Sequence, residues 1–144
     1  MTMLYHASCV QLEGGAVLLA GPSGAGKSDL ALRLIHEGGR LVGDDYVHLE
    51  LVGGRLMASA PAAIRGKIEV RGVGIIDAPS VERAEVRCLI SLAPARDAVE
   101  RLPEPARLEL AGVALPVFTL YPFEPSAAAK VAAALALCDN PGRT

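Results

Sequence analysis

Residues 16–28 read AVLLAGPSGAGKS, and this stretch decides the fold. Its first five residues form a short continuous apolar run after Gly14-Gly15, which predicts a strand buried on both faces. From Lys27 onwards apolar residues recur at helical spacing, and Gly38-Gly39 supplies a stop signal. We therefore predict a strand, a glycine-rich loop and a helix, in that order.

The loop fits the pattern G-x-x-x-x-G-K-[ST]. Its residues are Gly21, Pro22, Ser23, Gly24, Ala25, Gly26, Lys27 and Ser28. Glycines allow backbone torsions that turn successive N–H groups inward, and the helix that begins there directs its positive dipole end to the same point. Lys27 would reach the β- and γ-phosphates, and the Ser28 hydroxyl would coordinate Mg²⁺. We predict that this phosphate loop (residues 21–28) binds the phosphates of a nucleotide.

A second unusual stretch, LVGDDYV at residues 41–47, places two adjacent carboxylates after an apolar run. Residues 40–43 predict a strand that returns after the helix, and such a crossover would bring Asp44 and Asp45 beside the end of the first strand. A phosphate-transfer site needs carboxylates there. An exposed turn between two strands, where Asp is common, explains the pair equally well.

The remaining pattern is dominated by strands. Alternating or apolar runs predict strands at residues 47–51, 55–58, 67–70, 86–92, 107–110 and 113–120, with a hairpin turn at Gly53-Gly54. Ser126 can cap one further helix that runs to about Cys138. We therefore expect a single α/β domain over residues 1–144, with a mixed sheet and few helices.

Composition excludes several classes of function. The chain has 144 residues, 51% of them hydrophobic, and a formal charge of −2 with scattered basic residues. With three tyrosines, two phenylalanines and no tryptophan, it lacks the basic stripe and the stacking surface of a nucleic-acid-binding protein. It has neither a signal peptide nor an apolar run long enough to span a membrane, so we expect a cytoplasmic protein. The three cysteines form no CxxC pair and predict small buried side chains.

The motifs of some nucleotide enzymes are missing. The single asparagine, Asn140, precedes a proline, which disfavours a GTPase with an Asn-Lys-x-Asp element, and no H-R-D or D-F-G string indicates a eukaryotic protein kinase. Two alternatives remain open: a small-molecule kinase with a closed metabolite pocket, and a regulatory module that binds ATP without transferring its phosphate. A small-metabolite kinase usually carries an arginine-rich lid, and none is evident.

Residues 67–76 read KIEVRGVGII. Glu69 and Arg71 would share one strand face, and Gly72 and Gly74 would let a backbone or a ligand approach closely. A solvated sheet face explains the charges but not the glycines. His6 lies just before the first core strand, and taken alone a structural role for it is favoured over a catalytic one.

Taken together, four segments resemble the catalytic domain of bacterial HPr kinase/phosphorylase, in order and in separation. They are YHASCV (5–10), GPSGAGKSD (21–29), GGRLVGDDYV (38–47) and IEVRGVGII (68–76). The resemblance covers residues 4–77 well and the rest weakly. It implies a P-loop domain of the phosphoenolpyruvate-carboxykinase type, commonly assembled as a hexamer. It also implies phosphorylation of a serine on HPr, a small carrier protein of the phosphotransferase system, with ATP and Mg²⁺, and in many members the reverse phosphorolysis.

The resemblance assigns roles to individual residues. Residues 21–28 become the nucleotide loop, with Ser28 and Glu69 as Mg²⁺ ligands. His6 and Lys27 match catalytic positions. Asp45 matches the residue that takes the serine proton and returns one in the reverse direction.

Two further roles are less direct. Asp44 would support the site near Mg²⁺-bound water or the loop backbone. Arg101, in VERLPEP at residues 99–105, matches an arginine that assists at the phosphoryl group, although a surface arginine remains the alternative.

The chain also departs from the family pattern. It begins close to His6, so we expect a minimal catalytic unit without the separate N-terminal domain of longer members and without the regulation that this domain confers. The segment that the family associates with phosphorolysis reads PVFTLY at residues 116–121 and has no arginine, which weighs against phosphorolysis. The loop after Ile76 is short, a feature that would change how a protein substrate docks.

Overall fold

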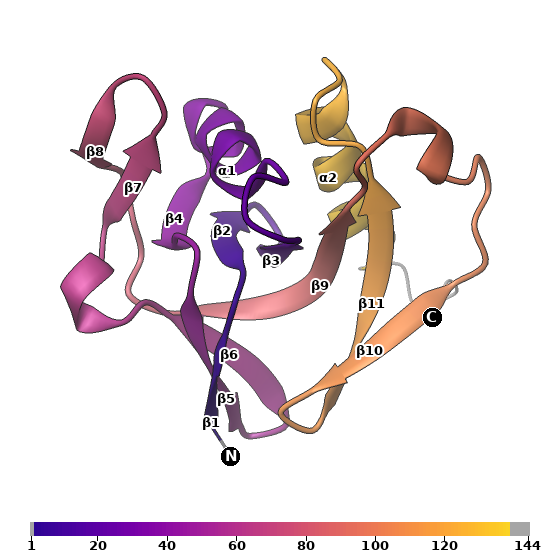
Figure 1. The fold of residues 1–144 in the computed structure, drawn as a ribbon. Coiled ribbons are helices and arrows are strands. Elements are labelled where there is room, and N and C mark those ends of the chain that lie inside the picture. Colours follow the sequence, from indigo (N-terminus) through magenta and orange to yellow (C-terminus); the bar gives the residue numbers. More distant parts are fainter. Residues whose placement is uncertain (1, 139–144) are drawn as a thin grey trace.

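The computed structural model describes residues 2–138. In chain order its strands are β1 (Thr2–Tyr5), β2 (Ser8–Leu12), β3 (Gly15–Ala20), β4 (Arg40–Gly43), β5 (Val47–Val52), β6 (Arg55–Ser59), β7 (Lys67–Val70), β8 (Gly74–Asp77), β9 (Ala84–Leu92), β10 (Ala106–Leu110) and β11 (Val113–Leu120). The α-helices of this part of the chain are α1 (Lys27–His36) and α2 (Ala127–Cys138). Figure 1 shows how these elements are arranged.

Within residues 2–138, nine strands form one curled sheet in the order β1-β5-β6-β9-β3-β2-β4, and β11 and β10 continue from β9. The start of β9 pairs with β6, whereas its later residues lie between β3 and β11. Pairings β3–β9 and β9–β11 are parallel and the other pairings in this sheet are antiparallel. The prediction of a mixed sheet with few helices is confirmed.

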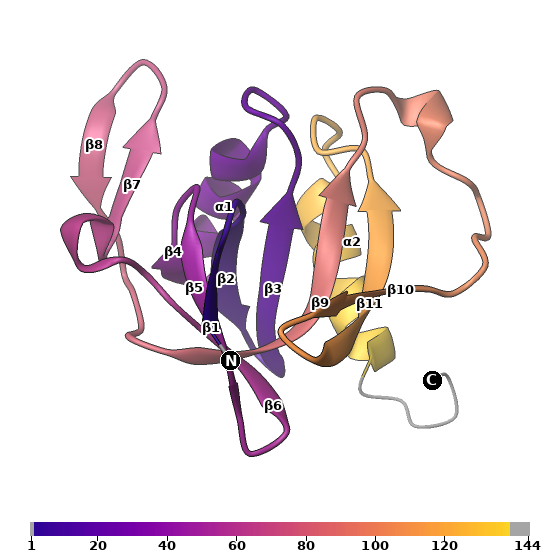
Figure 2. The same ribbon diagram turned by 60° about the horizontal axis from the view of Figure 1, so that its bottom comes forward.

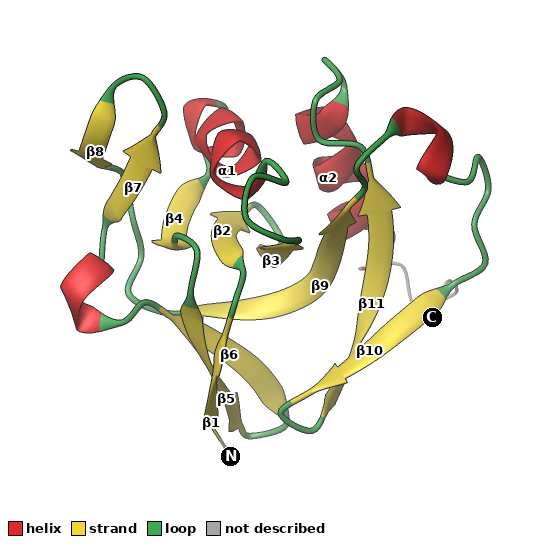
Figure 3. Cartoon of the chain, viewed as in Figure 1, coloured by secondary structure: helices red, strands yellow, loops and turns green. Residues whose placement is uncertain are grey.

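Both helices lie on the same side of the sheet (Figure 3). One core joins this side of β3 and β9 to α1 and α2 and includes Val17, Leu19 and Leu30. A second core lies on the opposite side, under β5 and β6, and includes Leu18 and Leu49. Strand β3 is therefore buried on both faces, which explains why its sequence is continuously apolar.

Helix α1 ends as its sequence predicts. The Gly38 N–H donates to the Ile35 carbonyl at 3.0 Å, and the Gly39 N–H donates to the Leu34 carbonyl at 2.9 Å. This pair of bonds is the Schellman arrangement, which needs a left-handed residue at the first position after the cap. Gly38 supplies it with a φ of 106°.

One expectation about the acids needs correction. Strand β4 does not pair with β3, because β2 lies between them and is antiparallel to both. Residues 8–12 do not show the strict alternation of a half-buried strand, so the sequence did not predict β2. Strands β1 and β8 were not predicted either. The ends of β3 and β4 still point the same way, and the phosphate loop and the acids follow these ends.

The hairpin β7–β8 forms a separate two-stranded sheet and stands at one end of the molecule, opposite the loop that precedes β10 (Figure 2). Strand β7 ends at Val70, so Arg71 lies in the turn and does not share a strand face with Glu69 as expected. The exposed side chains of Val73 and Ile75 lie at and beside this turn.

Cys9 and Cys88 are buried as predicted, and Cys138 is half-buried. No disulfide joins the three cysteines in the described chain. Burial raises the pKa of the Cys9 and Cys88 thiols, which keeps both protonated at neutral pH. No helix among residues 2–138 combines the length and the apolar character needed to cross a membrane.

Candidate active site

The two acids lie in a bend that directly follows β4, and the chain turns there in a way that separates them. Asp45 has a φ of 70°, a left-handed conformation that Asp tolerates better than most residues. The Asp44 side chain turns inward and is 8% exposed, whereas the Asp45 side chain is 54% exposed. The acids therefore face different surroundings because of a turn and not because of strand alternation.

Asp44 joins three parts of the chain through its carboxylate. Its Oδ1 atom accepts a hydrogen bond from the Ser28 hydroxyl at 2.6 Å and another from the Ser8 hydroxyl at 3.0 Å. Its Oδ2 atom accepts the backbone N–H of Glu69 at 3.2 Å. Asp44 thus connects the first turn of α1 to β2 and β7. Of the two predicted metal ligands, Ser28 contacts it through the hydroxyl, whereas Glu69 contacts it through the backbone N–H and is exposed.

Asp45 lies between two residues that the sequence places far from it. His6 Nε2 is 2.9 Å from Asp45 Oδ1, although 39 positions separate the two residues. Lys27 Nζ is 3.9 Å from the same oxygen. The His6 ring stacks on Tyr46, with ring centroids 4.8 Å apart, and this contact limits its rotation. His6, Lys27 and Asp45 therefore meet at one point.

Lys27 is 5% exposed and opens α1. Its Nζ atom donates to the carbonyls of Gly21 at 2.9 Å and Pro22 at 3.2 Å, so its charge lies within the curve of the phosphate loop. The preceding residue, Gly26, has a φ of 104°, and no side chain caps the helix at this position. The uncapped N–H groups of the first helical turn and the lysine ammonium are the donors that an anion needs.

These groups fit a nucleotide with Mg²⁺. The loop offers backbone N–H groups and one ammonium for the phosphates, while Ser28 and the neighbouring carboxylates offer the oxygen atoms that Mg²⁺ prefers. Among residues 2–138 no three His, Cys, Asp or Glu side chains gather into a cluster that could hold a metal alone. A Mg²⁺ ion bound here would take its remaining ligands from phosphate oxygens and water.

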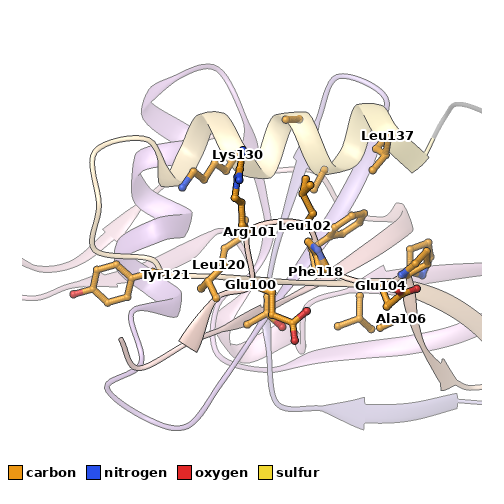
Figure 4. A pocket seen from close by; sticks show the side chains of 18 of the residues that line it. Glu100, Arg101, Leu102, Glu104, Ala106, Phe118, Leu120, Tyr121, Lys130 and Leu137 are labelled. Carbon is orange, nitrogen blue, oxygen red and sulfur yellow. The ribbon is translucent and has the colours of Figure 1, made fainter. Parts of the chain in front are cut away.

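Arg101 does not join this cluster. It lines a separate open cavity of about 1210 Å³ between the loop before β10, strand β11 and helix α2. In Figure 4 its side chain extends toward α2 near Lys130. Phe118 and Leu137 form part of the apolar lining of this cavity. No contact within the described residues links Arg101 to Lys27 or Asp45, so its part at the phosphoryl group stays a prediction.

Sequence reasoning missed Ser8, which is fully buried at the start of β2. Its hydroxyl donates to Asp44 Oδ1 and accepts the backbone N–H of Asp45, each at 3.0 Å. The only signal was a hydroxyl among apolar residues two positions after His6. This one group holds both acids in their turn.

Comparisons with known proteins agree on one family. The family model described as HPr Serine kinase C-terminal domain matches residues 1–119. The HPr kinase/phosphorylase of Clostridium tetani is 47% identical over 76 residues, which are 53% of this chain and 25% of that protein. The HPr kinase/phosphorylase of Caldanaerobacter subterraneus is 49% identical over 73 residues, which are 50% of this chain and 24% of that protein. These matches span about a quarter of the length of each relative.

A solved structure extends the likeness beyond this shared region. The Hpr(Ser) kinase/phosphatase from Coxiella burnetii is 28% identical, and its structure matches with a TM-score of 0.79 over 93% of this chain and 88% of that one. The similarity of fold therefore extends well beyond the 73 to 76 residues that these relatives share with the chain.

Proposed function

The chain belongs to the HPr serine kinase C-terminal domain family, and from this premise we propose that it is an ATP- and Mg²⁺-dependent protein serine kinase acting on an HPr-like phosphocarrier protein of a phosphotransferase system. The observation that carries the proposal is the meeting of His6, Lys27 and Asp45 beside the phosphate loop. A carboxylate within reach of both the loop lysine and open solvent can meet a serine brought by another protein.

Different residues of the chain would bind the phosphates and the metal ion. The N–H groups of the phosphate loop and the Lys27 ammonium hold the triphosphate, and the Ser28 hydroxyl with Glu69 would hold Mg²⁺. When bound, Mg²⁺ supplies charge neutralisation at the phosphate oxygens. Asp44 keeps Ser28 oriented through the 2.6 Å hydrogen bond.

Transfer then needs one base. Asp45 accepts the proton of the acceptor serine as the serine oxygen bonds to the γ-phosphorus. The bond from that phosphorus to the β–γ bridging oxygen breaks, and ADP leaves with the electron pair. His6 orients the Asp45 carboxylate from one side, while Lys27 balances the charge from the other. In the reverse direction protonated Asp45 returns its proton to the serine oxygen, by microscopic reversibility.

The first experiment measures transfer directly. The purified protein is incubated with labelled ATP, Mg²⁺ and candidate HPr-type proteins, and the modified residue is located by mass spectrometry. We expect phosphoserine on a carrier protein. A folded enzyme that binds ATP and modifies none of them contradicts the kinase proposal and favours an ATP-sensing module. Turnover with a metabolite panel instead favours a small-molecule kinase. Added inorganic phosphate tests phosphorolysis of the phosphorylated carrier.

The second experiment isolates the base. Asp45→Asn keeps the shape of the side chain and removes its basicity, so we expect nucleotide binding to persist while transfer falls by about 10²- to 10⁴-fold. Asp97→Asn, a matched change at an exposed aspartate on the loop before β10, should leave the rate unchanged. Full activity in Asp45→Asn removes this residue from the base role.

Further parts of the proposal rest on the family resemblance and on the composition of the sequence. We propose a phosphoenolpyruvate-carboxykinase type of P-loop domain, a homo-oligomer that is hexameric in solution, and a place in the cytoplasm without nucleic-acid or membrane partners. Light scattering coupled to size-exclusion chromatography measures the assembly, and a monomer at working concentration would contradict a hexamer.

A further inference from the structure

Phe123 lies in the connection between β11 and α2, and 55% of its side chain is exposed. Its ring lies directly against the phosphate loop. A Cβ atom built on Gly26 would fall 2.8 Å from the Phe123 Cζ atom, closer than real contacts allow. An exposed aromatic ring therefore lies beside the residue that immediately precedes Lys27.

The segment that carries this ring is held in place. The Arg33 guanidinium of α1 donates to the Pro122 carbonyl and, at 3.3 Å, to the Glu124 carbonyl. The Glu124 carboxylate is buried and forms an ion pair with Lys130 of α2. The ring is thus fixed by its two neighbours in the chain, so its position against the loop does not depend on its own burial.

The topology explains why this connection reaches the loop. Strands β3, β9 and β11 are parallel neighbours, so the segments that follow them leave from one edge of the sheet (Figure 1). Ligands of such sheets bind outside the carboxyl ends of the strands. A nucleotide whose phosphates occupy the loop after β3 would extend its nucleoside along this edge, where the connection after β11 lies.

We propose that Phe123 is the stacking surface for the nucleobase of the bound nucleoside triphosphate. Tyr121 adds an edge-to-face contact, with ring centroids 5.9 Å apart and an interplanar angle of 78°, which fixes the tilt of the Phe123 ring. The inference rests on the nucleotide-binding part of the proposed function and adds its base subsite. Because stacking uses the π face that every base has, Phe123 favours a nucleotide over bare phosphates and discriminates little between adenine and guanine.

The test compares Mg–ATP with Mg–tripolyphosphate by titration calorimetry, since the second ligand has phosphates and no base. In Phe123→Ala we expect the Kd for Mg–ATP to rise roughly 5- to 150-fold, the range for loss of one base–aromatic stack, with the Kd for Mg–tripolyphosphate unchanged. Phe123→Leu keeps an apolar contact with Gly26 but loses the aromatic face, so it should lower the affinity for Mg–ATP to a similar extent. Phe123→Trp should restore binding. Leu102→Ala, at an 84% exposed residue on the loop before β10, is the control.

If Phe123→Ala and Phe123→Leu lowered the affinity for Mg–ATP and for Mg–tripolyphosphate equally, the ring would only support the phosphate loop, and the inference would be overturned. Unchanged Mg–ATP affinity in both variants would overturn it too, as would a wild-type protein that binds Mg–tripolyphosphate as tightly as Mg–ATP. Failure of the kinase proposal is a separate outcome. A wild-type protein that prefers Mg–ATP to Mg–tripolyphosphate and phosphorylates no carrier protein would contradict the kinase activity but not the base subsite.

Discussion

Ser8→Ala tests the claim that one buried hydroxyl holds both acids. The change removes the hydrogen bond to Asp44 Oδ1 and the acceptor of the Asp45 N–H, each 3.0 Å long, at a fully buried position. Alanine keeps the Cβ atom, so the packing of β2 changes little. Asp44 retains its bonds from Ser28 and from the Glu69 backbone, and its charge is not left without donors.

The expected loss follows from these two bonds. A hydrogen bond to a charged group contributes about 1.5–3 kcal/mol, and an amide left without an acceptor costs about 1–3 kcal/mol. The second cost falls at the low end because the Asp45 side chain is half-exposed, so water can reach its surroundings. We expect the free energy of unfolding to fall by about 2.5–4 kcal/mol. Transfer activity should fall as well, because Asp45 leaves its left-handed turn and its contact with His6 loosens.

Urea denaturation measures the change. With an m-value of about 1.5 kcal/mol per molar, the midpoint should fall by roughly 1.7–2.7 M at constant m. Ser59→Ala, at the end of β6, also removes a strand hydroxyl and should change stability by no more than about 0.5 kcal/mol. Amide hydrogen exchange gives a local readout, because the Asp45 N–H should exchange faster in Ser8→Ala. A stability loss equal to that of Ser59→Ala, with unchanged exchange at Asp45, would refute the reasoning.

Gly26→Ala combines a φ of 104° with a Cβ atom 2.8 Å from the Phe123 ring, so both the melting temperature and the Mg–ATP affinity should fall; unchanged calorimetric values for both would contradict the geometry. Asp44→Asn places an amide N–H₂ group where the carboxylate accepts hydrogen bonds with both oxygens. We expect a lower affinity for Mg²⁺, measured by metal titration, and a lower free energy of unfolding, measured by urea denaturation. The hydrogen bond from Lys130 lowers the pKa of Glu124, so the unfolded chain binds more protons at low pH. Stability from this pair is therefore present above the ordinary pKa of 4.5 and is lost as the pH falls through the lowered folded value; Glu124→Gln should flatten this slope in thermal melts, and an unaltered slope would exclude the pair as its source.

Local signals predicted most of the fold. The apolar run of β3, the helical spacing of α1 and the Gly53-Gly54 hairpin each depend on residues close together in the chain, and each is confirmed. Strands β1, β2 and β8 lack a clear local period. The partner of β1 is the distant β5, whereas β8 pairs with the neighbouring β7, and β2 pairs with the neighbouring β3 and the more distant β4. The position of β2 between β3 and β4 follows from pairings that only the folded sheet defines.

The same division holds at the candidate site. The phosphate loop is readable from the sequence because its chemistry needs consecutive residues, and the four family segments are readable because each is contiguous. By itself the sequence therefore determined the phosphate-loop motif, the mixed sheet and the family resemblance. The local residue pattern did not rank Asp44 against Asp45, and only the family resemblance assigned the base role to Asp45.

Tertiary structure decided what depends on distance through space. A left-handed turn sends Asp44 inward to Ser28 and Asp45 outward to His6, and the fully buried Ser8 hydroxyl holds them both. The parallel order of β3, β9 and β11 brings Phe123 to the phosphate loop across nearly a hundred residues. Hydrogen bonds and ring contacts act over a few ångströms, so a sequence pattern specifies them only when the partners are also neighbours in the chain.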